Sequence, residues 1–263
     1  MGEPYVLAFV GQKGGTGKTT SAVNVGAALR ERGFRVLGVD LDPQGGMSRH
    51  LGVPTQDGKR SVRAALTGET PLVNLVVRSR SGILVVPSHS SLATVGVEVT
   101  SYAEQRLSAA LQPLADLPEK KRIHFVILDC PPSLDLLPLN AIHAAHGVVV
   151  PLSPAALRNG NLPGAMAKIN EVRALGRRAD LRILGVLPCQ VRKRTNLAQA
   201  IADMIPKLAP GVPVLPEIRL SVKVAEAPGN QLPLLQYASK HPAADDYRTA
   251  TAALLKRING RSE

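Results

Sequence analysis

A glycine- and lysine-rich stretch over residues 11–20 constrains this chain more than any other feature. It reads Gly11-Gln12-Lys13-Gly14-Gly15-Thr16-Gly17-Lys18-Thr19-Thr20 and follows an apolar run at 5–10 that is typical of a buried strand. The small and apolar residues of 21–29 then predict a helix. Glycines let the backbone curl so that successive N–H groups point inward, and the free N–H groups of a helix start face the same point. Strand, loop and helix in this order predict a loop that binds phosphate.

The side chains of this loop supply the other parts of a nucleotide site. Lys18 is expected to reach the β- and γ-phosphates, and the Thr19 hydroxyl is expected to ligate Mg²⁺. We therefore assign ATP binding to the loop residues Lys13, Gly14, Gly15, Thr16, Gly17, Lys18, Thr19 and Thr20. The alternative is a flexible turn with incidental lysines, which two lysines and three glycines in this strand–helix context disfavour.

Two further apolar runs end in carboxylates. One ends at Asp40, with Asp42 two residues further on the same side, and the other ends at Asp129. Because the carboxyl ends of parallel strands meet at one edge of a sheet, these side chains are expected beside the phosphate-binding loop. We predict Thr19, Asp40 and Asp129 as magnesium ligands and Asp42 as the group that orients an attacking water. The alternative for 40–45 is a strand-ending turn, because Asp-Pro is common in turns.

Strand and helix signals alternate along the whole chain, which is typical of a parallel sheet covered by helices. We predict a single α/β domain over 1–263, similar to P-loop NTPases, with a mostly parallel twisted sheet and helices on both faces. Further strands are expected at 34–39, 82–86, 124–129, 147–152, 181–187 and 214–218. Further helices are expected at 62–66, 103–111, 137–144, 156–175, 197–208 and 242–258. Residues 53–82 carry no motif.

Composition narrows the class of protein. The chain has no apolar run of 18 residues, so we expect no membrane span, and the first strand begins too early for a signal peptide. Cys130 and Cys189 lack the spacing of a disulfide framework or a cysteine metal site, which fits the cytoplasm. Lys and Arg total 32 against 20 Asp and Glu, a formal charge of +12. This excess favours a polyanionic partner, although a merely soluble basic protein stays an alternative.

Four ordered blocks carry a resemblance to a known family. Residues 12–20 contain a phosphate loop with a second lysine, the deviant Walker A form, and 40–45 read D-L-D-P-Q-G. Residues 129–133 read D-C-P-P-S, and 194–228 contain R-T-N-L and end in E-A-P. With these blocks the chain resembles the ParA/MinD/Soj group of deviant Walker A ATPases, and most of all its ParA/Soj branch.

The resemblance implies a slow ATP hydrolase for chromosome or plasmid partition, with Lys13, Lys18 and Asp42 as catalytic residues. ATP and Mg²⁺ would be the cofactors, and ATP would hold a homodimer together, with Lys13 crossing to the partner's phosphates. The dimer would bind double-stranded DNA without sequence preference until a ParB-type protein stimulates hydrolysis. We expect a cytoplasmic, nucleoid-associated protein without an N-terminal helix-turn-helix domain.

The resemblance also assigns surface residues between 190 and 223. DNA contacts are expected from Arg192, Lys193, Arg194, Arg219 and Lys223, and adenine contacts from Gln190, Arg219 and Ser221. This chain departs from the family pattern, because Arg192 replaces an acid, Arg219-Leu220-Ser221 replaces Pro-Arg-Asn, and Lys223 replaces an Arg. Cations at the start of a helix are electrostatically unfavourable, which favours a function for them over a solvated helix start.

Other classes stay open. A membrane-associated positioning ATPase like MinD would need a membrane-binding C-terminal helix, whereas we interpret the apolar stripe of 247–258 as packing on the core. An iron–sulfur ATPase would need dedicated cysteine ligands. A small-molecule ATP-dependent enzyme would need a substrate pocket that no motif indicates.

Overall fold

Short apolar runs build a seven-stranded sheet in the order β3-β4-β2-β5-β1-β6-β7. The computed structural model describes residues 3–99, 102–133, 135–175, 178, 180–192 and 195–260. Every pairing in the sheet is parallel except that of β3 with β4. The predicted α/β class with a mostly parallel sheet is therefore confirmed.

The elements have the following bounds. The strands are β1 Tyr5–Phe9, β2 Val36–Asp40, β3 Val77–Arg78, β4 Leu84–Val86, β5 Phe125–Asp129, β6 Gly147–Leu152 and β7 Arg182–Pro188. The helices of the N-terminal half are α1 Lys18–Glu31, α2 Gly46–His50, α3 Val62–Thr67, α4 Val95–Glu98 and α5 Arg106–Leu111. Those of the C-terminal half are α6 Leu136–Ala144, α7 Pro154–Arg158, α8 Asn161–Leu175, α9 Asn196–Leu208, α10 Val222–Glu226, α11 Leu234–Tyr237 and α12 Pro242–Ile258.

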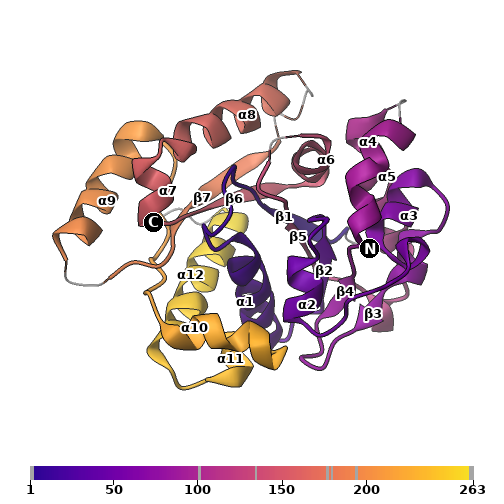
Figure 1. Cartoon of the computed structure of the whole chain (residues 1–263), viewed down its shortest axis with the longest axis horizontal. Coiled ribbons are helices and arrows are strands. Elements are labelled where there is room, and N and C mark those ends of the chain that lie inside the picture. The colour runs from indigo at the N-terminus through magenta and orange to yellow at the C-terminus, as the bar shows by residue number, and fades with distance from the viewer. Residues whose placement is uncertain are drawn as a thin grey trace.

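Helices cover both faces of the sheet and make a three-layered molecule (Figure 1). Side chains alternate along each strand, so Val6 and Ala8 of β1 face one apolar core while Leu7 and Phe9 face the other. The first core is closed by α3, α5, α6, α8 and α9, and the second by α1, α2, α11 and α12. Strands covered on both faces explain why these runs are continuously apolar.

The apolar stripe of α12 lies in the second core, as the sequence predicts. Ala250 and Leu254 are buried, and Ala253 and Ile258 pack against the same cluster. Within the described part of the chain, no helix combines the length and the apolar character that crossing a bilayer requires.

Two expectations about secondary structure were wrong. The segment at 214–218 forms an isolated bridge with β7, between Val214 and Val186, instead of a strand, because Pro216 has no N–H to donate to a ladder. The helix expected at 156–175 is divided into α7 and α8 at Gly160, whose φ of 69° is left-handed. The short elements β3 and α2 are absent from the sequence prediction.

Candidate nucleotide site

The glycines of the 11–17 loop take backbone conformations that other residues avoid. Gly15 has a φ of 73° and Gly17, which precedes the first residue of α1, has a φ of 94°. The loop thereby turns from the end of β1 into α1 within a few residues. The N–H groups of the first turn of α1 face the loop, which is the arrangement an anion requires.

The two lysines of this loop lie in opposite environments. Lys18 is buried, with 6% of its surface exposed, and its Nζ donates to the carbonyl oxygen of Lys13 at 2.6 Å. Burial lowers the pKa of Lys18, while the charge of Asp129 acts in the opposite direction. The side chain of Lys13 is exposed at the tip of the loop. One lysine is therefore buried in the site, and the other is exposed to solvent.

Asp129 is a fully buried carboxylate at the end of β5. Its residue exposure is 0%, and neither carboxylate oxygen accepts a hydrogen bond from the residues that the structure describes. Burial first, and then the charge of Asp40, raises the pKa of Asp129 well above its ordinary value, and the nearby Thr19 hydroxyl opposes this shift. The register places Asp40 directly opposite Asp129 on the neighbouring strand. An unpartnered buried carboxylate is costly without a cation or an added donor.

Asp40 has the opposite character, because both of its oxygens accept hydrogen bonds. Oδ2 accepts from the backbone N–H of Ser48 at 2.8 Å and from the Ser48 hydroxyl at 2.6 Å, and Oδ1 accepts from the N–H of Asp42 at 3.2 Å. Burial raises the pKa of Asp40 to about 6, and the bonds from Ser48 limit that rise. Sequence reasoning missed Ser48, since the short helix α2 that carries it gives no periodic signal.

Asp42 lies half-buried at the start of the loop between β2 and α2. Its Oδ1 accepts from the N–H of Gln44 at 2.9 Å, and its carbonyl accepts from Gly45 at 2.7 Å. Sharing one end of the sheet with Lys18 and Asp129, it influences the pKa values of both groups. The structure therefore brings Lys18 and Asp42 into one corner with the predicted magnesium ligands, whereas the third predicted catalytic residue, Lys13, is exposed at the tip of the loop.

The donors in this corner fit Mg²⁺. Thr19 and Asp129 offer oxygen ligands. A hard cation would satisfy the carboxylate oxygens of Asp129, which accept no hydrogen bond from the described residues. No group of three His, Cys, Asp or Glu side chains among the described residues is arranged to hold a metal alone. Magnesium usually takes one or two protein oxygens and completes its shell with water and substrate phosphates, so a sparse set of protein ligands is what such a site needs.

A cavity of about 350 Å³ opens beside the loop. It extends from Gly17 and Thr20 to the three residues predicted at the adenine, Gln190, Arg219 and Ser221. Gln190 has a left-handed φ of 59°, and its Nε2 donates to the carbonyl of Gly15 at 2.9 Å. The predicted adenine residues thus lie together next to the phosphate-binding loop.

The predicted DNA-binding cations are less uniform. Arg192 is exposed, whereas Lys193 and Arg194 lie outside the described residues. Lys223 donates to Oε2 of Glu226 at 2.8 Å and lies 5.5 Å from the centre of the Tyr237 ring. The guanidinium of Arg219 forms two bonds with Asp246, at 2.5 and 2.7 Å. Asp246, which sequence reasoning missed, is 27 residues away on α12 and therefore invisible to local patterns.

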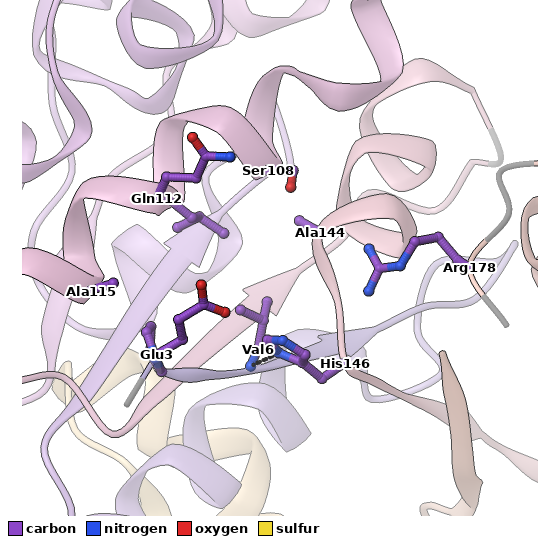
Figure 2. Close-up of a pocket in the computed structure, with 10 residues that line it drawn as sticks. Glu3, Val6, Ser108, Gln112, Ala115, Ala144, His146 and Arg178 are labelled. Atoms are coloured by element: carbon purple, nitrogen blue, oxygen red, sulfur yellow. Dashed lines mark hydrogen bonds between the residues drawn. The ribbon is translucent and has the colours of Figure 1, made fainter. Parts of the chain in front are cut away.

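A second cavity lies at the opposite end of β1 and contains none of the predicted residues (Figure 2). It has a volume of about 170 Å³ and is lined in part by Glu3, His146 and Arg178. His146 Nδ1 already accepts from the N–H of Val6, and Arg178 donates to the carbonyl of Ala145. These polar groups are occupied in holding the fold, so the nucleotide corner stays the candidate site.

Known proteins match this chain over nearly its whole length. Residues 5–183 match the family described as an AAA domain. The chromosome partitioning protein ParA of Caulobacter vibrioides is 35% identical over 263 residues, which covers 97% of this chain and 96% of the relative. The chromosome-partitioning ATPase Soj of Thermus thermophilus is 36% identical over 252 residues, which covers 96% of each.

A solved structure agrees with these matches. The cobyrinic acid a,c-diamide synthase from Mycobacterium smegmatis with bound ATP analogue and magnesium is 32% identical and superposes with a TM-score of 0.84. The match covers 98% of this chain and 97% of that one.

The fold and the loop define a P-loop nucleotide-binding domain. With the relatives above, the chain belongs to the ParA/Soj family of deviant Walker A ATPases. The resemblance inferred from the sequence is thereby confirmed. ATP and Mg²⁺ as cofactors are confirmed at the level of the family, because the solved relative holds an ATP analogue with magnesium.

Proposed function

We propose that this chain is a partitioning ATPase that uses ATP to form a homodimer, binds DNA as that dimer and releases it on hydrolysis. The observation that carries the proposal is the placement of the two lysines of one loop. Lys18 is buried and directed inward, whereas Lys13 is exposed. A loop that served only its own nucleotide would need only the inward cation.

The ATP site is assigned to residues 13–20 and the cavity beside them. Lys18 would leave the carbonyl of Lys13 and contact the β- and γ-phosphates, which offer a charged acceptor in place of a neutral one. Thr19 and Asp129 would hold Mg²⁺, which supplies charge neutralisation at the phosphates when it is bound. The adenine would occupy the cavity near Gln190 and Ser221. Arg219 also lines this cavity, and its hydrogen bond to Asp246 holds its side chain in place.

Hydrolysis is assigned to Asp42 as the group that orients the attacking water. Its Oδ1 is held by the Gln44 N–H, which leaves Oδ2 as the oxygen for a water molecule. Asp42 is more exposed than Asp40 and Asp129, so water can reach it. We expect turnover to be slow until a ParB-type partner binds, as in the family pattern.

The homodimer is assigned to the face that carries Lys13. From the tip of the loop the ammonium group of Lys13 would cross to the phosphates of the partner subunit and act like an arginine finger. ATP would then hold the two subunits together, since without its phosphates the two loops would bring like charges together.

DNA binding is assigned to the basic surface that includes Arg192 and Lys223, together with Lys193 and Arg194. A formal charge of +12 supports contact with phosphates, and phosphate contacts carry no base information. We infer a non-specific complex with double-stranded DNA, a nucleoid-associated protein and the role of partitioning a chromosome or a plasmid.

A DNA titration in three nucleotide states tests this proposal. Fluorescein-labelled duplexes of two unrelated sequences are titrated with protein plus ADP, ATP or a slowly hydrolysed ATP analogue. We expect binding with ATP and the analogue but not with ADP, equal affinity for both sequences, and weaker binding as salt rises. Absence of DNA binding in all three states would contradict the proposal and favour a small-molecule enzyme instead.

A further inference from the structure

The helix α2 packs tightly between β2 and the start of α1. A Cβ atom on Gly38 of β2 would lie 2.6 Å from the sulfur of Met47, so the glycine is needed for α2 to approach the strand. A Cβ atom on Gly46 would lie 3.1 Å from the hydroxyl oxygen of Thr19. The first residue of α2 therefore touches the predicted magnesium ligand, and the helix body touches the strand that ends in Asp40.

Ser48, in the middle of α2, is bonded on both sides. Its hydroxyl donates to Oδ2 of Asp40 at 2.6 Å and accepts from the backbone N–H of Ser88 at 3.0 Å. Its own N–H donates to the same oxygen of Asp40 at 2.8 Å. Ser48 is buried, with 1% of its surface exposed, so these bonds form away from bulk water, where a lost partner is costly.

These bonds close the segment from Asp40 to Ser48 into a ring that carries Asp42. Asp40 accepts from Ser48 at one oxygen and from the N–H of Asp42 at the other. Gly45 donates to the carbonyl of Asp42, and Gln44 donates to its Oδ1. Asp42 thus lies in a loop whose two ends, Asp40 and Ser48, are joined by hydrogen bonds.

We propose that Ser48 is a positioning residue that acts through Asp40 to fix Asp42. In this arrangement Asp40 anchors the loop, because both of its carboxylate oxygens accept hydrogen bonds from the loop residues Asp42 and Ser48. Asp129 is then the carboxylate that is open to magnesium. The proposal rests on the proposed function for the role of Asp42, but the closed loop itself is a property of the nucleotide-free protein. Loss of the Ser48 hydroxyl should loosen the loop without removing any phosphate contact.

Two measurements on Ser48→Ala test this assignment. The first is amide hydrogen exchange without nucleotide, in which the N–H groups of residues 42 and 44–48 should exchange at least about tenfold faster while those of 14–20 stay unchanged. The second is steady-state ATP hydrolysis, in which kcat should fall about tenfold or more with KM within about twofold, because a misplaced water-orienting group lowers only the chemical step.

Matched variants separate positioning from general damage. Ser88→Ala removes a neighbouring buried hydroxyl that has no partner among the described residues, so it should behave like the wild type in both measurements. Ser48→Thr keeps the hydroxyl and should recover most of the exchange protection and of kcat. If Ser48→Ala does not fold, Ser48→Cys, which fills the space of the hydroxyl with a weakly hydrogen-bonding thiol, is expected to show the same two changes.

Unchanged exchange at 42–48 in Ser48→Ala, or in a Ser48→Cys used in its place, would overturn the proposal. A loss of kcat that Ser88→Ala reproduces, or that Ser48→Thr fails to recover, would overturn it equally. Failure of the proposed function gives a different result. If the wild type had no ATPase activity, Ser48→Ala would still exchange its loop amides faster than the wild type.

Discussion

The nucleotide corner and the basic surface of residues 190–226 lie at the same end of the sheet but differ in how their charges are held. In the corner, three charged side chains are buried, namely those of Lys18, Asp40 and Asp129. On the surface, Arg192 and Lys223 are exposed, and Lys223 is paired with a neighbouring acid. The Arg219 side chain, 29% exposed, is paired with an aspartate whose side chain is 8% exposed.

Because of this difference in burial, a charged residue in the corner is stronger evidence for a functional role than a charged residue on the surface. A buried charge is tolerated only with a partner or a ligand, so Lys18 and Asp129 point to chemistry. An exposed cation is screened by water and salt and can exchange partners at little cost. Substitutions in the corner should therefore have large and specific effects, and those on the surface should have smaller, salt-dependent ones.

The largest effect is expected for Lys18→Ala. This change removes the buried lysine of the loop, so ATP affinity should fall by at least about 100-fold, as expected for a desolvated charge–phosphate contact. A fluorescent ATP analogue titrated by anisotropy measures the affinity. Unchanged binding would mean that the loop is not the phosphate site.

Asp42→Ala should affect turnover and spare binding. Loss of the group that orients water should lower kcat by about 100-fold, while ATP affinity stays within about threefold of the wild type. Coupled phosphate-release assays and the same anisotropy titration separate the two quantities. Hydrolysis at the wild-type rate would reassign the role, with Asp40 as the first alternative.

On the surface, the double change Arg192→Glu and Lys223→Glu should weaken DNA binding about tenfold or more at low salt. Reversing two charges in each subunit of a dimer removes about four phosphate contacts, so the slope of log K against log salt should flatten by about 3–4. DNA titrations at several salt concentrations measure both quantities.

Arg219→Ala is the control for that comparison. Because Arg219 is bonded to Asp246, we expect Arg219→Ala to cost about 2 kcal/mol of folding free energy. At ATP concentrations that saturate the adjoining nucleotide cavity, it should change DNA affinity little. If Arg219→Ala abolished DNA binding in a stably folded protein with bound ATP, the contrast between the half-buried Arg219 and the exposed cations Arg192 and Lys223 would be wrong.

The smallest effect is expected for Asp129→Asn in protein free of magnesium and nucleotide. The pKa of Asp129 lies above its unfolded value of about 3.9, so its contribution to stability is present below that value and is lost as pH rises through the folded pKa. The neutral amide avoids this loss, so Tm should rise by about 3 °C at pH 8 and by much less at pH 4. Thermal scans with a chelator at both pH values provide the test, and a lower Tm at pH 8 would contradict it.

The sequence predicted the corner better than the surface for a physical reason. The placement of Lys18, Asp40, Asp42 and Asp129 in one corner follows from glycines and strand ends that local patterns reveal. The partnership of Arg219 with Asp246, like that of Asp40 with Ser48, depends on tertiary packing that no local pattern carries.

The sequence contains residues that argue against the two wrong secondary-structure predictions. Pro216 within the expected last strand argues against a ladder, and Gly160 followed by Pro163 is typical of one helix ending and another beginning. Hydrophobic periodicity outweighed these residues in the prediction. The two-residue strand β3 and the five-residue helix α2 are too short for any periodic signal.

The central claim is that the exposed lysine of the loop serves a second subunit, and sedimentation of Lys13→Ala tests it most directly. Wild type and Lys13→Ala are compared by analytical ultracentrifugation with ADP and with a slowly hydrolysed ATP analogue, after anisotropy has established that both bind nucleotide. We predict that the wild type is monomeric with ADP and dimeric with the analogue, whereas Lys13→Ala binds the analogue and stays monomeric. A Lys13→Ala protein that dimerises like the wild type, or a wild type with the same mass in both states, would contradict the account.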